Sequence, residues 1–180
     1  MASAKQDQDI VVQIAKNYKK IDISVPKLTK LVKAICKRFT QYEARDIRYE
    51  ISIAIVDDAQ IRKLNRRFLN RKPATDCLSF DLSDDEKTSE IRNRKTKTFE
   101  MVVNGEMALR QANLRGHSSE AELALYITHG LLHHLGFDDS TQSQARKMHD
   151  TEDEILQQLG YGLVYNKGMR AQKHRSTGNT

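Results

Sequence analysis

The hydrophobic residues at the start of the chain follow periods that predict a strand, a helix and a second strand. Ile10–Ala15 is a short apolar run of the kind found in buried strands. From Pro26 to Phe39 apolar residues recur every three to four positions, and the proline near the first turn favours a helix. Between Ile47 and Ile55 large apolar residues, mostly isoleucine, occupy every second position, which predicts the second strand.

A second helix and a third strand are predicted next. Asp57 is a suitable N-cap, and the helix after it has an apolar face that we expect to be buried, formed by Ile61, Leu64 and Phe68. The chain then turns at Pro73 and enters Cys77–Leu82, which we interpret as a strand.

The middle of the chain is less regular. The stretch from Ser83 to Thr98 is polar and charged without any period, which indicates an exposed loop. Phe99–Leu109 predicts a further extended segment, with a bulge or kink at Asn104 and Gly105. We expect a short helix after it that ends at Gly116.

Two more helices complete the predicted fold. Ser119 and Glu122 have the spacing of a capping box, and Thr141 and Gln144 repeat it before a last helix that ends at Gly160. The residues of this last helix that we expect to face inward are Ala145, Met148, Ile155, Leu156 and Leu159. Strands and helices are mixed without sustained βα alternation. The pattern therefore predicts an α+β single domain, with a small mixed β-sheet of about four strands packed with about five helices.

Length and composition limit the class of protein. With 180 residues, 38% of them hydrophobic, the chain suits one domain, which we place at residues 10–160. We expect residues 1–9 to be disordered and residues 161–180 to form a flexible basic tail without acidic residues. The two isolated cysteines favour a reducing cytoplasm, and no apolar run is long enough to span a membrane.

Positive charge is concentrated in one short stretch. The formal net charge is +6, which favours polyanionic partners. Six cations fall within eleven residues, with no acidic residue among them: Arg62, Lys63, Arg66, Arg67, Arg71 and Lys72. An ordinary solvated helix face and a surface that contacts a phosphate backbone both account for this pattern, and the sequence leaves both open.

The candidate chemistry lies between Thr128 and Asp139, in the sequence THGLLHHLGFDD. His129 and His133 stand four residues apart on an apolar helix, so both imidazoles lie on one face and can share a metal ion. Histidines at this spacing are also common where they are only solvated or hydrogen-bonded. Gly130 between them costs about 1 kcal/mol of helix propensity, which a close approach of backbone would explain.

We expect a carboxylate to join the two imidazoles as a third metal ligand. Gly136 predicts the end of the helix, so the chain turns back and brings an aspartate toward the imidazoles. Two imidazoles and one carboxylate favour zinc, with one position open for a water that attacks a phosphorus centre or a carbonyl carbon. The nearby candidates for the third ligand are His134, Asp138, Asp139 and His149. His134 points about 100° away around the helix, and spacing does not choose between the aspartates.

The general base is not identified by these patterns. A zinc protease helix carries a glutamate directly after its first histidine, and this chain has Gly130 there, which disfavours that class. Asp138, His134 and Glu106 remain candidates for the base.

Several stretches resemble one family. HGLLHHLGFDD is similar to the HGxLHLxGYDH signature of the YbeY family of metal-dependent rRNA-maturation endoribonucleases. Val56–Phe68, Thr75–Phe80 and the GEMAL stretch from Gly105 are similar to further blocks of that family, in the same order. The resemblance covers most of residues 10–160. It implies a cytoplasmic, metal-dependent, single-strand-specific endoribonuclease in small-subunit rRNA 3′-end maturation and ribosome quality control. RNA and the small ribosomal subunit would be its partners, and neither DNA nor a membrane is expected.

The resemblance also implies roles for individual residues. His129 and His133 match the first two metal-binding histidines of the family, and the third falls on Asp139, so one Zn²⁺ would have these three ligands. The functionally important arginine of the family falls on Leu69. Arg67 or Arg71 could replace it, and the RNA contacts implied in this region are Arg66, Arg67, Arg71 and Lys72.

Two other functions are compatible with these observations. A non-catalytic, metal-stabilised ribosome-assembly or RNA-binding factor is supported by the leucine at position 69. A metal-dependent hydrolase with a smaller substrate is disfavoured by the basic surface. Turnover of a labelled RNA separates the enzyme from the assembly factor.

Overall fold

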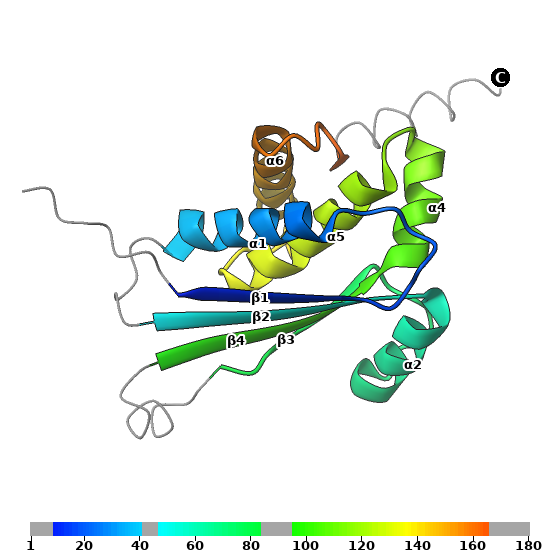
Figure 1. The fold of residues 1–180 in the computed structure, drawn as a ribbon, viewed down its shortest axis with the longest axis horizontal. Helices are drawn as coiled ribbons and strands as arrows, with labels where there is room; N and C mark the ends of the chain where they lie inside the picture. The colour runs from blue at the N-terminus through cyan, green and yellow to red at the C-terminus, as the bar shows by residue number, and fades with distance from the viewer. Residues whose placement is uncertain (1–8, 41–46, 84–94, 166–180) are drawn as a thin grey trace, which may run out of the picture.

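A mixed four-stranded sheet organises the fold (Figure 1). The computed structural model describes residues 9–40, 47–83 and 95–165. The strands lie in the order β1-β2-β4-β3, with bounds Ile10–Lys16 for β1, Ile47–Val56 for β2, Cys77–Asp81 for β3 and Lys95–Asn104 for β4. β1, β2 and β4 are parallel, and β3 runs antiparallel to β4 at the edge.

The described helices cover the two faces of the sheet unequally. Their bounds are Val25–Thr40 for α1, Asp58–Leu69 for α2, Gly105–Arg115 for α4, Ser119–His134 for α5 and Gln142–Gln158 for α6. Figure 1 shows α1, α5 and α6 on one side of the sheet and α2 on the other, near one end. The predicted α+β class, with a small mixed sheet and five helices, is confirmed for the described residues.

Helix α5 is the central helix of the core. Every residue from Ala121 to Leu132 is buried except His129, because the helix lies between the sheet and the other helices. An almost wholly apolar helix is expected in such a position. Its neighbours in the sheet include Met101, and a Cβ atom added to Gly130 would lie 2.6 Å from the Met101 Cε atom. Side chains of the sheet thus approach the helix closely at this glycine, whereas the sequence predicts a close approach of backbone.

The prediction for the middle of the chain is wrong in two places. β4 begins at Lys95, so the predicted loop up to Thr98 is too long, and the extended segment ends at Asn104. The strand pairs residue by residue with β2 over its whole length, with no bulge. Gly105 begins α4, because the Asn104 side chain caps that helix by accepting a hydrogen bond from the Met107 N–H at 2.9 Å.

The buried face of α2 also differs from the prediction. Ile61 is fully buried, but Phe68 is 55% exposed and makes an edge contact with Phe80 at 5.4 Å between ring centroids. Asn65 is buried instead, because its side-chain amide donates a hydrogen bond to the Pro73 carbonyl oxygen at 2.8 Å. A polar residue at a buried position is stable only when it has such a partner.

The ends of α5 and α6 are determined by local hydrogen bonds. The N-cap of α5 is Ser118, one residue before the predicted Ser119, and Glu122 lies buried beside Arg115 and His117 instead of closing a capping box. Thr141 caps α6 as predicted. Gly136 and Gly160, both with positive φ, follow the ends of α5 and α6 as predicted, since glycine adopts this conformation without strain.

Residues just after Gly160 also pack against α6. Val164 is fully buried, and its N–H donates a hydrogen bond to Asp153 Oδ1 at 3.0 Å. Residues up to Tyr165 therefore pack on α6. The predicted disordered stretch, apart from Asp9, and the rest of the predicted tail lie outside the described residues. No helix in the described ranges is both long and apolar enough to cross a membrane.

Both cysteines are expected to be unreactive in the folded protein. Burial raises the pKa of Cys36 to about 12, and burial together with the charge of Asp76 raises the pKa of Cys77. Only the thiolate reacts, and at pH 8 about one Cys36 side chain in ten thousand is ionised. With Ellman's reagent at pH 8 we expect slow reaction of the native protein and rapid reaction of two thiols in guanidinium chloride. Rapid reaction of either thiol without denaturant would contradict this.

Candidate metal centre

The two histidines predicted to share an ion lie side by side at the end of α5. Their Nε2 atoms are 3.2 Å apart, and the rings are nearly perpendicular, with centroids 4.7 Å apart. The helix ends at His134, and just after Gly136 the Phe137 N–H donates a hydrogen bond to the Leu132 carbonyl oxygen at 3.0 Å. This reversal brings the following residues back toward the imidazoles.

Asp139 is the aspartate that reaches them. Its carboxylate oxygens lie 3.9 Å from His129 Nε2 and 3.9 Å from His133 Nε2. One ligand atom from each of the three residues lies within 4.8 Å of the other two. A tetrahedral ion about 2.1 Å from its ligands needs them about 3.4 Å apart, so small side-chain shifts suffice. These residues fit a bound metal ion.

Asp138 has a different role in the same turn. Its carboxylate accepts hydrogen bonds from the backbone N–H groups of Asp139 and Ser140, at 2.8 and 3.2 Å, and from the Ser140 hydroxyl at 2.6 Å. The bonds from Ser140 hold the pKa of Asp138 below its usual value. Asp138 therefore shapes the turn, and Asp139 is the aspartate whose carboxylate lies near both imidazoles.

Hydrogen bonds at Nδ1 determine which nitrogen of each histidine is available to bind a metal ion. His133 Nδ1 donates to the Phe137 carbonyl oxygen at 3.2 Å, and His129 Nδ1 donates to Glu152 Oε1 at 2.7 Å. Both partner oxygens are acceptors, so each Nδ1 carries a proton, and Nε2 is the nitrogen through which each neutral ring can bind a metal ion. Burial lowers the pKa of His129, but the hydrogen bond and charge of Glu152 outweigh it and leave the pKa raised.

The group is open to solvent. The side chains of His129, His133 and Asp139 are 25%, 35% and 42% exposed. An ion held there would keep a coordination position accessible to water, as catalytic zinc sites do.

Glu152 is not among the residues predicted from the sequence. It is fully buried on α6 and accepts hydrogen bonds from His129 and, at 2.8 Å, from His149 Nδ1. The sequence periodicity of α6 could have indicated that Glu152 is buried, because this residue lies on the same helix face as Met148 and Ile155, both buried. A carboxylate on the buried face of a helix needs a partner in the interior.

Two other candidates from the sequence do not join the group. His134 stacks on Phe99, with centroids 4.5 Å apart, and burial lowers the pKa of its imidazole. Glu106 accepts a hydrogen bond from the Asp58 N–H at 3.0 Å, near the start of α2. Neither belongs to a potential metal-binding group found among the described residues.

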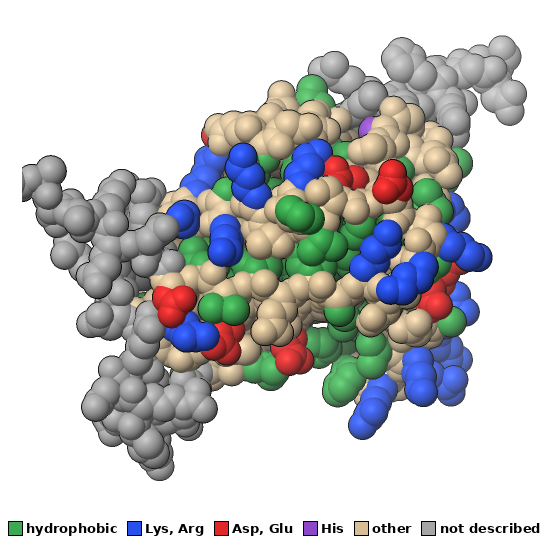
Figure 2. Space-filling model, in the orientation of Figure 1, with side chains coloured by type: hydrophobic (Ala, Val, Ile, Leu, Met, Phe, Trp, Pro, Cys, Tyr) green, Lys and Arg blue, Asp and Glu red, His purple; other side chains and the backbone are tan. Residues whose placement is uncertain are grey.

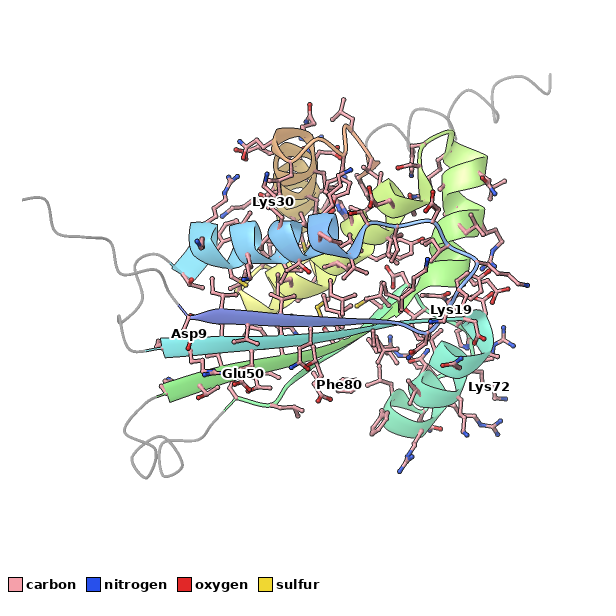
Figure 3. All side chains as sticks on the ribbon, viewed as in Figure 1. Asp9, Lys19, Lys30, Glu50, Lys72 and Phe80 are labelled. Atoms are coloured by element: carbon pink, nitrogen blue, oxygen red, sulfur yellow. The ribbon has the colours of Figure 1, made fainter. Side chains whose placement is uncertain are left out.

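The basic residues lie on the other side of the sheet from α5. Arg66, Arg67, Arg71 and Lys72 are all exposed on α2 and the turn after it. Figure 2 shows Lys and Arg side chains gathered over α2, and Lys72 is labelled there in Figure 3. Within the described ranges none of the four forms an ion pair. Leu69 is 50% exposed.

The fold and the site define the class of this protein: an α+β domain with an open cluster of two histidines and a carboxylate that could hold a catalytic metal. The family model described as Endoribonuclease YbeY matches residues 13–160. The chain belongs to this family.

Curated relatives agree with this assignment, and a solved structure has a similar fold. The chain is 35% identical over 140 residues to Endoribonuclease YbeY of Clostridioides difficile, covering 78% of this chain and 90% of the relative. It is 36% identical over 140 residues to Endoribonuclease YbeY of Desulforamulus reducens, covering 77% and 92%. A solution structure from Thermotoga maritima, 20% identical, has a TM-score of 0.50 and covers 82% of this chain and 91% of its own. At that identity it shows the fold alone.

Proposed function

We propose that this chain is a metal-dependent endoribonuclease that hydrolyses single-stranded RNA. Its place would be the cytoplasm, in 3′-end maturation of small-subunit rRNA and in ribosome quality control. The observation that carries the proposal is the convergence of His129, His133 and Asp139, with both Nε2 atoms available, in a member of this family. The relatives named Endoribonuclease YbeY support RNA as the substrate. Cleavage of a labelled single-stranded RNA, before and after chelation, tests this function.

One Zn²⁺ ion would be held by His129 Nε2, His133 Nε2 and the Asp139 carboxylate. When bound, the ion supplies a Lewis acid for a phosphoryl oxygen and an acidified water. The chain supplies the geometry: Glu152 and the Phe137 carbonyl oxygen orient the two rings, and Asp138 holds the turn that carries Asp139. Such fixed ligands lower the cost of assembling the centre.

The proposed RNA contacts are Arg66, Arg67, Arg71 and Lys72. An exposed cation without an ion pair contacts a phosphate without first breaking another interaction. Arginine also binds phosphate oxygens in a bidentate way, so Arg67 or Arg71 is proposed to replace the arginine that the family has at Leu69. Since α2 and α5 lie on opposite faces of the sheet, an RNA that contacts both must pass around its border.

The third ligand is tested by metal content. Replacing Asp139 with alanine removes one of three ligands, so we expect Zn²⁺ affinity to fall by more than about a hundredfold. Elemental analysis of the purified protein is expected to give one ion per chain for the wild type and much less for Asp139→Ala. The control is Asp138→Asn, which keeps an oxygen to accept the turn hydrogen bonds and should retain the metal. Equal metal content in wild type and Asp139→Ala would exclude Asp139 as a ligand.

The leucine at position 69 favours one alternative, an RNA-binding ribosome-assembly factor stabilised by its metal but without catalysis. Such a protein would bind the labelled RNA and leave it intact under conditions where the metal is fully loaded. Cleavage that disappears with the metal excludes this alternative.

A further inference from the structure

A fully buried carboxylate joins two imidazoles behind the proposed metal centre. Glu152 Oε1 accepts from His129 Nδ1 at 2.7 Å, and Oε2 accepts from His149 Nδ1 at 2.8 Å. Among the described residues Glu152 has no ion pair with lysine or arginine. A buried carboxylate is costly unless both oxygens are satisfied. Here the two imidazole N–H groups satisfy them.

The hydrogen bond to Oε1 determines how His129 faces the metal. With its proton held on Nδ1, the ring has its lone pair on Nε2, the atom that lies 3.2 Å from His133 Nε2. Turning the ring over, or moving the proton to Nε2, would break the contact with Glu152. The buried carboxylate thus selects the tautomer and the ring orientation that a metal ligand requires.

The second oxygen is held by an equally constrained group. The His149 ring stacks on Tyr165, with centroids 3.6 Å apart and planes 11° apart. Tyr165 is fixed in turn, because its backbone N–H donates to Asp153 Oδ1 at 3.0 Å. His149 therefore cannot follow a displaced Glu152 easily, and Oε1 stays on His129.

His129, His149 and Glu152 do not form a second metal-binding site of the same kind as the first. His129, His149 and Glu152 also bring ligand atoms within 4.8 Å of one another. Their contacts of 2.7 and 2.8 Å, however, are hydrogen-bond distances, shorter than the separation of about 3.4 Å between tetrahedral zinc ligands. Both Nδ1 atoms are donors here and have no lone pair to offer.

We infer that Glu152 is a positioning residue for the metal centre, and that His149, stacked on Tyr165, keeps its carboxylate in place. The inference rests on the proposed function in one respect, that the centre binds a metal. It adds that this metal affinity depends on α6 and on the segment after it, and not only on the end of α5.

The test is Zn²⁺ affinity, measured on the full chain by competition with a chromophoric chelator. In Glu152→Gln only one side-chain oxygen remains to accept, so we expect the Zn²⁺ Kd to rise about 10- to 100-fold, the usual effect of losing such a partner. His149→Phe keeps a ring on Tyr165 but removes the Nδ1 donor, and a rise of about three- to tenfold is expected. The control is Glu154→Gln, an exposed glutamate on the same helix, which should leave the Kd unchanged.

A second measurement separates positioning from general support of the fold. In the ion-free protein at pH 8, the ¹⁵N shifts of the His129 ring should report an Nδ1–H tautomer, and Glu152→Gln should increase the Nε2–H form. Wild-type Zn²⁺ affinity and an unchanged tautomer in both Glu152→Gln and His149→Phe would overturn the inference and leave the proposed function intact. Absence of Zn²⁺ binding by the wild type would instead overturn the metal centre itself. If Glu152→Gln does not fold, His149→Phe alone decides.

Discussion

Replacing His129 with alanine is expected to reduce RNA cleavage by about a thousandfold or more and to remove the bound metal. The Lewis acid and the acidified water of a bound ion contribute several kcal/mol to catalysis, and each 1.36 kcal/mol corresponds to about tenfold in rate. The loss follows because Nε2 of His129 is one of the three ligand atoms of the proposed centre, together with Nε2 of His133 and the Asp139 carboxylate. The measurement is kcat/KM on a labelled single-stranded RNA, together with metal content.

His134→Gln is the matched control for this prediction. His134 follows His133 directly but stacks on Phe99 and takes no part in the metal-binding group. We expect this variant to keep its metal and its cleavage activity, which would also exclude His134 as the general base. Wild-type turnover by His129→Ala, at a metal content below one ion per ten chains, would refute metal-dependent catalysis at this site.

The second large effect is expected on RNA binding. Replacing Arg67 and Arg71 together with alanine should weaken binding about tenfold at moderate salt, which corresponds to about 0.7 kcal/mol for each exposed cation. If each contacts one phosphate of a single strand, the slope of log K against log salt becomes shallower by about 1.4. Thermal stability should be unchanged, because neither residue forms an ion pair within the described parts of the chain.

The control variant removes two cations from the opposite side of the sheet. Lys30 and Lys33 are exposed on α1, and Lys30 is labelled there in Figure 3. The double alanine variant has the same net charge as the Arg67 and Arg71 variant, so it measures the non-specific effect of charge. Equal affinities and equal salt slopes for the two variants would dismiss α2 as the RNA-binding surface.

Much of the proposed metal centre could be predicted because its parts are local in sequence. His129 and His133 share a helix face because of their spacing, and Gly136 ends the helix because glycine adopts a positive φ without strain. Strands β1 and β2 were equally predictable, since β1 is a short apolar run and the buried residues of β2 are apolar and occupy alternate positions. The first residues of β4 were not, because strand pairing and not their own apolar character holds Lys95 and Thr96 in the sheet.

What the sequence by itself determined is therefore what lies within a turn or two of one helix: the histidine pair, the end of the helix and the family signature. Only the tertiary structure decided which aspartate faces the imidazoles, and it alone brought Glu152 to His129 across 23 positions of sequence. It also placed α2, with its cations, and α5 on opposite faces of the sheet. The physical reason is that a spacing determines direction within one element, whereas contacts between elements depend on how all their buried surfaces pack together.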